Sequence, residues 1–292
     1  MNTLEESEVV TEKKRRGRKP KKANQKELLN MYHDEIGYTK DTPNSGYSKT
    51  ILENIKYLSP TEKQGFDSKF TTPKNIHQEQ YVSMLKHKAK KIIVVSGPAG
   101  TGKTLFATEY GVRNFLLGVY DKLIFTRPSV SVDEDLGYLP GTLEEKMAPW
   151  VRPIYDVLNQ FISPKDITQY MEDKVIEIAP LGYMRGRTFK NAWIVADEMQ
   201  NSTVSQMKML LTRLGENSRI VITGDLDQYD RVGEINGLED FLKMFKGKRS
   251  SSITSFEFDR TDIQREEVVK EVLDIYAGEH SPYLGNTDIV EE

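Results

Sequence analysis

The sequence contains a glycine-rich octapeptide whose residue types suit the binding of phosphate. It reads Gly97-Pro98-Ala99-Gly100-Thr101-Gly102-Lys103-Thr104 and follows the apolar run Ile92-Ile93-Val94-Val95. It matches the phosphate-loop pattern G-x-x-x-x-G-K-[ST] at every fixed position. Glycines allow successive backbone N–H groups to face one anion, and a helix beginning here would direct its positive end toward the same anion. A plain strand-to-helix turn is the alternative, but the flanking apolar segments favour a nucleoside triphosphate site.

Two side chains of this loop have separate expected roles. Lys103 is predicted to reach the β- and γ-phosphates, and the Thr104 hydroxyl is predicted to ligate Mg²⁺. All eight residues from 97 to 104 are therefore predicted to bind the nucleotide.

A second candidate catalytic segment is Asp197-Glu198, which directly follows the apolar run Ala192–Ala196. Asp197 is expected to hold Mg²⁺ through water. Glu198 is expected to polarise the attacking water as a general base. Acidic residues at a strand end are common, but their occurrence after a phosphate loop favours this interpretation and points to hydrolysis.

A third element is Gly224-Asp225-Leu226-Asp227-Gln228, which follows another apolar run. Because the carboxyl ends of parallel strands meet in one crevice, Asp225 and Gln228 could lie beside Lys103 and Asp197. The Gln228 amide could then sense the γ-phosphate and orient water. Ordinary turn chemistry also explains glycine and aspartate at this place.

Asn75 and Gln78 lie about 20 residues before the phosphate loop and are candidates for reading the adenine edge. An amide presents a donor and an acceptor together, as that edge does. Asn75 could equally be the N-cap of a helix that begins there.

Composition narrows the remaining possibilities. The chain has 292 residues and four scattered histidines. It has no cysteine, which excludes disulfides and metal sites with thiolate ligands. No apolar run is long enough to span a bilayer, and the first residues do not resemble a secretory signal. We therefore expect a cytoplasmic protein that does not contact membranes.

Charge is unevenly distributed along the chain. Residues 13–22 carry eight positive charges while the whole chain has a net charge of −3, so the remainder carries −11. Arg16-Gly17-Arg18-Lys19-Pro20 resembles the AT-hook, an extended arm for the minor groove of DNA, although Lys19 interrupts its usual Arg-Gly-Arg-Pro core. Arg16 and Arg18 would make these contacts. A polybasic tail that binds any polyanion is an equal alternative.

Short apolar runs alternate with longer amphipathic stretches from about residue 71, which predicts an α/β fold with a mostly parallel sheet. The predicted strands are Lys91–Ser96, Lys122–Thr126, Lys174–Ile178, Ala192–Ala196, Arg219–Thr223 and Ile253–Phe258. We expect a disordered basic arm over 1–25, a helical lead-in over 26–70, the ATPase domain over 71–278 and a flexible acidic tail over 279–292.

These motifs together resemble the first motor domain of superfamily-1 helicases, and the segments between them resemble the PhoH family of ATPases. The matching segments include Thr126-Arg127-Pro128, Leu136-Gly137-Tyr138-Leu139-Pro140-Gly141, Ala179–Thr188, Asp197–Asn201 and Gln206–Arg213. The resemblance covers about residues 70–278. It implies one RecA-like domain that hydrolyses ATP with Mg²⁺ and acts on RNA or single-stranded DNA. Such proteins often occur in phage genomes, which would place this one in the host cytoplasm.

The resemblance also implies roles for several arginines. Asp262-Ile263-Gln264-Arg265 aligns with the family's Asp-Val-Val-Arg, and Arg265 would complete the nucleotide site of a neighbouring subunit, with Arg213 as second choice. That arrangement implies a homo-oligomer, such as a hexameric ring. Nucleic acid would lie near Arg127, Arg185 and Arg187. Surface salt bridges and simple solvation are the alternatives for these arginines.

Two other function classes remain open at this point. One is a P-loop kinase or phosphate-starvation ATPase acting on a small molecule. The other is a DNA-binding module in which the basic arm binds DNA and ATP serves as a switch. The Asp197-Glu198 pair favours the ATP-driven motor, because it points to water as the phosphoryl acceptor.

Overall fold

A computed structural model describes residues 59–128, 143–230, 233 and 235–276. The predictions for the basic arm with Arg16 and Arg18, for residues 26–58 of the lead-in, for Leu136–Gly141 and for the tail at 279–292 lie outside the described residues.

The six predicted strands are all present, with small changes at their ends. Their bounds are β1 Ile92–Ser96, β2 Lys122–Arg127, β3 Ile176–Pro180, β4 Ala192–Ala196, β5 Arg219–Gly224 and β6 Ile253–Glu257. The prediction for β3 was wrong by two residues, because Lys174 has a φ of +55° and forms a turn before the strand. A lysine in this left-handed region cannot continue extended backbone.

The strands form one sheet in the order β3-β2-β4-β5-β1-β6. Every described pair of neighbours is parallel, so the sheet is fully parallel where the sequence predicted it to be mostly so. β5 lies between β1 and β4 and pairs with both, from Ile92↔Ile220 on one side to Trp193↔Arg219 on the other. The three strands that carry the predicted chemistry are therefore adjacent.

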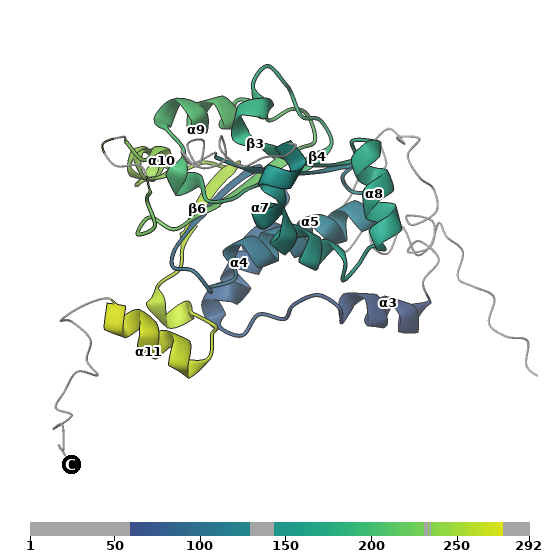
Figure 1. Ribbon diagram of the computed structural model, residues 1–292, viewed down its shortest axis with the longest axis horizontal. Helices are drawn as coiled ribbons and strands as arrows, with labels where there is room; N and C mark the ends of the chain where they lie inside the picture. The colour runs from purple at the N-terminus through teal and green to yellow at the C-terminus, as the bar shows by residue number, and fades with distance from the viewer. Residues whose placement is uncertain (1–58, 129–142, 231–232, 234, 277–292) are drawn as a thin grey trace, which may run out of the picture.

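Helices cover both faces of this sheet (Figure 1). Their bounds are α3 Pro60–Asp67, α4 Ile76–Lys86, α5 Lys103–Leu116, α7 Leu143–Leu158, α8 Pro164–Glu172, α9 Val204–Leu211, α10 Gly237–Phe245 and α11 Glu267–Tyr276, with short 3-10 turns η1 Leu181–Met184, η2 Met199–Asn201 and η3 Arg260–Asp262.

Successive residues of each strand point to opposite faces, which divides the core into two clusters. Trp193 and Val195 of β4 join the cluster under α4, α5, α7 and α8. Ile194 belongs to the cluster under α9 and α10. Burial on both faces explains why the strands are continuous apolar runs. This architecture is the RecA-like α/β fold that the sequence predicted.

The last part of the lead-in packs against the body. Phe66 of α3 is buried, and the Phe70 ring stacks on Phe161 with centroids 4.4 Å apart. The buried Glu109 carboxylate of α5 accepts both the backbone N–H and the hydroxyl of Thr71 at 2.8 and 2.7 Å. These contacts fix the chain just before α4.

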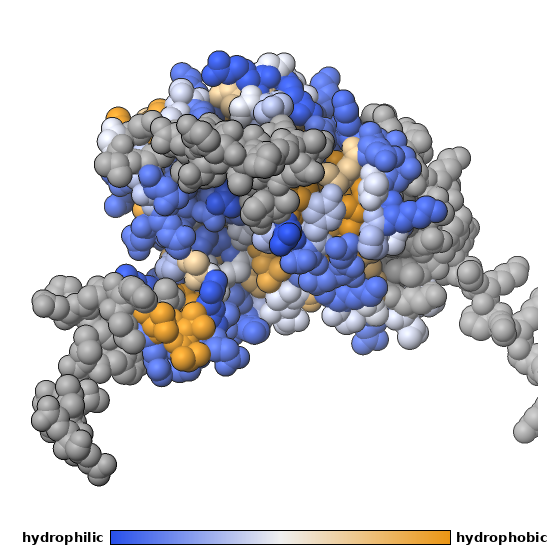
Figure 2. All heavy atoms as spheres, in the orientation of Figure 1, coloured by the Kyte–Doolittle hydropathy of each residue, from blue (hydrophilic) through white to orange (hydrophobic). Residues whose placement is uncertain are grey.

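Near the carboxyl end of the described chain, α11 stands apart from the sheet, and its exposed Val268 and Val272 belong to the apolar patch visible there (Figure 2). Within the described residues, no helix combines the length and the apolar character needed to cross a bilayer.

Candidate functional site

The phosphate-binding loop connects β1 to α5 and adopts the backbone that its glycines allow. Gly97, Gly100 and Gly102 all have positive φ, at 139°, 87° and 90°. A Cβ on Gly97 would lie 2.6 Å from the Phe258 carbonyl oxygen, which rules out any larger residue there. Lys103 is the first residue of α5, so the amino end of that helix faces the loop.

Helix α4 is hydrogen-bonded to this loop at two points. The Tyr81 hydroxyl is fully buried and donates to the Lys103 carbonyl at 3.0 Å, and Gln78 Nε2 donates to the Thr101 carbonyl at 3.0 Å. Burial raises the pKa of Tyr81 well above its ordinary value, so its hydroxyl remains a neutral donor.

Lys103 lies folded into the loop, with Nζ 2.5 Å from the Gly97 carbonyl and 2.6 Å from that of Pro98. Burial lowers its pKa from the ordinary lysine value, while the carboxylates of Asp225, Asp197 and Glu198 oppose that shift. The ammonium group is thus desolvated and held by carbonyl oxygens. An incoming phosphate would offer it a stronger, charged acceptor.

Asp197 follows β4 and accepts two hydroxyl groups on one oxygen. Thr104 Oγ1 donates to Asp197 Oδ1 at 2.7 Å, and the buried Thr223 hydroxyl of β5 donates to the same oxygen at 2.6 Å. A hydroxyl and a carboxylate at this separation are the oxygen donors that Mg²⁺ prefers. Thr104 and Asp197 therefore fit the predicted metal site. No sequence motif pointed to Thr223, because it is the pairing of β4 with β5 that brings it to Asp197.

Glu198 has left-handed backbone, with φ of 53° and ψ of 36°. This conformation is uncommon for a residue with a side chain and recurs at functional sites. Its carboxylate accepts a hydrogen bond from Gln200 Nε2 at 2.5 Å. Asp197 and Glu198 are adjacent in the chain but therefore have different hydrogen-bond partners.

Gln228 and Asp225 lie at the end of β5, as predicted. Gln228 Nε2 donates to Asp225 Oδ2 at 2.8 Å, and the Asp227 N–H donates to Asp225 Oδ1 at 3.1 Å. Asp225 is buried, whereas the Gln228 side chain is exposed. Asp225 therefore positions the glutamine that the sequence assigned to phosphate sensing.

A cavity of about 350 Å³ brings these groups together. Its walls come from the phosphate loop, the end of β4 and the end of β5, and are formed by Ala99, Gly100, Gly102, Lys103, Thr104, Leu105, Asp197, Glu198, Gly224, Asp225 and Gln228. The structure thus unites the three chemical elements that lie far apart in the sequence.

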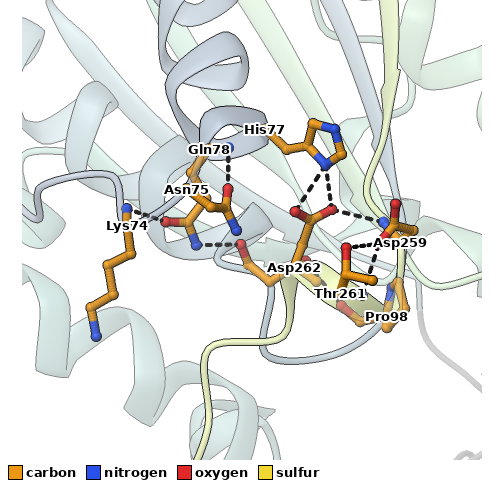
Figure 3. Close-up of polar contacts among 9 residues, drawn as sticks. Lys74, Asn75, His77, Gln78, Pro98, Asp259, Thr261 and Asp262 are labelled. Atoms are coloured by element: carbon orange, nitrogen blue, oxygen red, sulfur yellow. Dashed lines mark hydrogen bonds and ion pairs between the residues drawn. The ribbon is translucent and has the colours of Figure 1, made fainter.

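The two amides proposed to read adenine differ in what they contact (Figure 3). Gln78 is buried, and its Oε1 accepts the Lys74 N–H at 2.8 Å while its Nε2 is bonded to Thr101. Asn75 caps α4 by accepting the Gln78 N–H at 2.8 Å, and among the described residues its buried Nδ2 has no acceptor. Gln78 therefore fixes the loop in this conformation, and Asn75 retains a donor for a base. Contact with adenine stays a prediction for both.

The exposed Arg265 lies against the phosphate loop of its own chain. Its Nε would be 2.8 Å from a Cβ placed on Gly100, and the neighbouring Gln264 N–H donates to the Gly100 carbonyl at 3.0 Å. The sequence assigned Arg265 to a neighbouring subunit. Its side chain packs against the loop of its own chain, and a role for it in a neighbouring subunit stays a prediction.

Three other arginines singled out in the sequence lie on or contact the loop that follows β3, namely Arg185, Arg187 and Arg213. Arg213 donates from Nε to the Met209 carbonyl and from Nη1 to the Arg187 carbonyl, both at 3.2 Å. Arg187 pairs with Glu177 at 2.6 Å and lies over the Phe189 ring. Arg185 is exposed on the same loop. Arg213, the second choice for a trans role, thus holds this loop within its own chain.

Arg127 ends β2, where it pairs in register with Pro180 of β3, and it is only partly exposed. It therefore shares the carboxyl edge of the sheet with the Arg185 loop and the nucleotide cavity. Sequence reasoning missed the exposed Tyr183 of η1, which lies two residues before Arg185.

The fold and the cavity define a protein of the P-loop nucleoside triphosphatase class. A family model described as "PhoH-like protein" matches residues 71–277. The chain is 43% identical over 241 residues to the PhoH-like protein of Bacillus subtilis, covering 78% of this chain and 74% of the relative. It is 42% identical over 248 residues to that of Mycobacterium tuberculosis, covering 82% and 68%. This chain belongs to the PhoH-like protein family.

Two further matches cover a smaller part of this chain or have a lower sequence identity. Protein PhoH of Escherichia coli is 41% identical over 194 residues, which are 65% of this chain and 55% of that protein. The match to the solved UvsW helicase from bacteriophage T4 covers 80% of this chain and 77% of the helicase chain. The two have 12% sequence identity and a TM-score of 0.35. That score is too low to bear on function.

Proposed function

We propose that this protein binds ATP with Mg²⁺ at the 97–104 loop, hydrolyses it, and couples hydrolysis to RNA or single-stranded DNA. The observation that carries the hydrolytic part is that two adjacent carboxylates have different partners. Asp197 accepts hydrogen bonds from the hydroxyls of Thr104 and Thr223, whereas Glu198 accepts one from the Gln200 amide. One carboxylate is thereby available for the metal and the other for water.

The loop and its lysine would bind the triphosphate. Backbone N–H groups of the glycine-rich turn and the amino end of α5 favour an anion. Lys103 would exchange its two carbonyl acceptors for phosphate oxygens. Thr104 and Asp197 would hold Mg²⁺, which supplies charge neutralisation at the phosphates.

Glu198 would accept the proton of the attacking water, which requires that its carboxylate face the cavity. Gln228 also faces that cavity and could orient the same water through its amide. These two side chains reach the cavity from β4 and β5, opposite the loop that binds the phosphates. That geometry suits hydrolysis better than transfer to a metabolite, the chemistry of the kinase alternative.

A surface at the carboxyl edge of the sheet supports the coupling to nucleic acid. The Tyr183 ring is 59% exposed, although Leu181 and Met184 on either side of it are fully buried. Arg185 follows on a loop that Arg213 and Glu177 fix through Arg187. An exposed aromatic ring close to an exposed guanidinium is suited to stack a base and contact a phosphate.

The test is steady-state ATP hydrolysis by the full chain, with and without single-stranded RNA or DNA. Wild-type protein should hydrolyse ATP, and either polymer should stimulate it. Glu198→Gln should bind ATP as tightly as wild type while turnover falls by about 10²–10⁴-fold. Normal turnover in Glu198→Gln would contradict the assignment of the base. Hydrolysis indifferent to both polymers would instead favour a small-molecule substrate or a protein-regulated switch.

A further inference from the structure

Gln200 is a buried polar side chain next to the nucleotide cavity, and both ends of its amide are hydrogen-bonded. It is fully buried, on the turn η2 that directly follows Glu198. Its Nε2 donates to Glu198 Oε2 at 2.5 Å and to the Gln228 carbonyl at 3.1 Å. Its Oε1 accepts the Asp225 N–H at 3.1 Å. Both ends of one amide are therefore bonded to residues of the site.

The orientation of this amide follows from the chemistry of its partners. A carboxylate and a backbone carbonyl can only accept, and a backbone N–H can only donate. Only an amide with its NH₂ toward Glu198 and its oxygen toward Asp225 satisfies all three partners. A side chain that lacks the acceptor would leave the buried Asp225 N–H unsatisfied, and one that lacks the donor would release the partly buried Glu198 carboxylate.

The space around Gln200 is fitted to it. A Cβ on Gly224 would lie 2.8 Å from Gln200 Oε1 and 3.2 Å from its backbone nitrogen. The absence of a side chain at Gly224 therefore allows the amide to lie across the end of β5. From there it reaches the loop that carries Gln228.

The adjacent residue makes a second connection between the same two loops. Asn201 is buried, and its Nδ2 donates to Asp230 Oδ2 at 2.9 Å while its Oδ1 accepts the Asp230 N–H at 3.0 Å. Gln200 and Asn201 thus join the turn after Glu198 to the segment 225–230 at two points. The two loops are held as one unit.

We propose that Gln200 is a positioning residue for ATP hydrolysis, which holds the Glu198 carboxylate and the Gln228 loop at a fixed separation. This inference rests on the proposed function. Glu198 lines the nucleotide cavity, whereas Gln200 is not among the described residues that line it. Its contribution is to keep the base in its left-handed turn, aligned with the loop that carries the phosphate-sensing glutamine.

Three variants of the full-length protein test this role. Gln200→Met keeps the approximate size but removes the donor and the acceptor. Gln200→Glu keeps an acceptor for the Asp225 N–H but replaces the donor that faces Glu198 with a second carboxylate. Ser202→Ala is the matched control, because the Ser202 hydroxyl is buried next to the same turn and, within the described part of the chain, bonds only to the Met199 carbonyl.

We expect Gln200→Met to lower kcat by about 100-fold while KM for ATP and the affinity for a non-hydrolysable ATP analogue change by about twofold or less. Ser202→Ala should keep wild-type kcat even if its melting temperature falls. Gln200→Glu should lower kcat at least as much as Gln200→Met, because it places a second carboxylate against Glu198 where the amide donor was.

A Gln200→Met or Gln200→Glu enzyme with the wild-type kcat would overturn the proposal. If Gln200→Met does not fold, the kcat of Gln200→Glu, measured with its KM for ATP, decides alone. Absence of ATP hydrolysis in wild-type protein would overturn the proposed function and this role together. Hydrolysis by wild type with unaffected Gln200 variants would overturn only the role of Gln200.

Discussion

Arg265 packs against Gly100, so an arginine near the carboxyl end of the described chain lies over the phosphate-binding loop of the same chain. The Gln264 N–H fixes this position by donating to the Gly100 carbonyl at 3.0 Å. A Cβ on Gly100 would collide with the Arg265 side chain, which comes as near as 2.8 Å. The φ of 87° requires glycine at this position, whereas the exposed Arg265 side chain could move aside from a Cβ.

This contact predicts that Arg265 acts within one chain. Arg265→Ala should lower ATP turnover by about 10²–10³-fold with little change in nucleotide affinity, as expected when a donor to developing charge is lost. Mixing Arg265→Ala with Lys103→Ala should restore no activity, because neither chain then holds a complete site. Recovery in the mixture, together with an oligomer in solution, would place the arginine on a neighbouring subunit instead.

Removal of the Thr223 hydroxyl should weaken the metal site without removing a ligand. Thr223→Val takes away the donor at 2.6 Å from Asp197 Oδ1 and leaves that oxygen with the Thr104 hydroxyl. We expect a loss of about 1 kcal/mol of stability and a higher Mg²⁺ concentration for half-maximal ATPase activity. Thr223→Ser is the control and should resemble wild type in both measurements.

His77 should make stability depend on pH. Its Nδ1 lies 2.9 Å from both Asp262 carboxylate oxygens (Figure 3). That hydrogen bond raises the pKa of His77 above its ordinary value of 6.5, opposed by desolvation and assisted by the charges of Asp262 and Asp259. Because the folded-state pKa is the higher one, the stabilisation is complete below about pH 6.5 and disappears as pH rises through the folded value.

Denaturant unfolding at several pH values between about 6 and 8 checks this prediction. Wild-type protein should lose stability relative to His77→Gln as pH rises, since the variant lacks the titrating ring. Parallel curves for the two proteins would show that the His77–Asp262 pair contributes nothing that depends on pH.

Tyr183 should contribute to nucleic-acid affinity through its ring. Tyr183→Ala should weaken binding to a labelled single-stranded RNA of about 20 nucleotides by roughly tenfold or more, because stacking on one base contributes about 1–3 kcal/mol. Tyr183→Phe keeps the ring and should bind as wild type does. Fluorescence anisotropy measures both, and equal affinities for the alanine and phenylalanine variants would contradict stacking.

Arg185 provides a complementary measurement on the same surface. If its exposed guanidinium contacts a phosphate, Arg185→Ala should reduce the slope of log affinity against log salt by about 0.7 for single strands. An unchanged slope would mean that Arg185 is simply solvated.

The sequence by itself determined the local chemistry of this protein. The 97–104 loop, the Asp197-Glu198 pair and the 224–228 turn are short contiguous patterns, and each is positioned by the end of one strand. Glycine content, apolar runs and helix caps act over a few residues, which is why six strands and the position of α4 after Asn75 could be predicted. The error at β3 arose at Lys174, where a left-handed turn precedes the strand and leaves no periodic signal.

Tertiary structure decided which distant residues meet. The insertion of β5 between β1 and β4 brings Thr223 to Asp197 and places Gln200 across Gly224. The same packing commits the Gln78 amide to the phosphate loop and turns Arg265 back onto Gly100. Hydrogen bonds between segments tens of residues apart depend on strand order and side-chain packing, and neither is encoded in the spacing of any single motif.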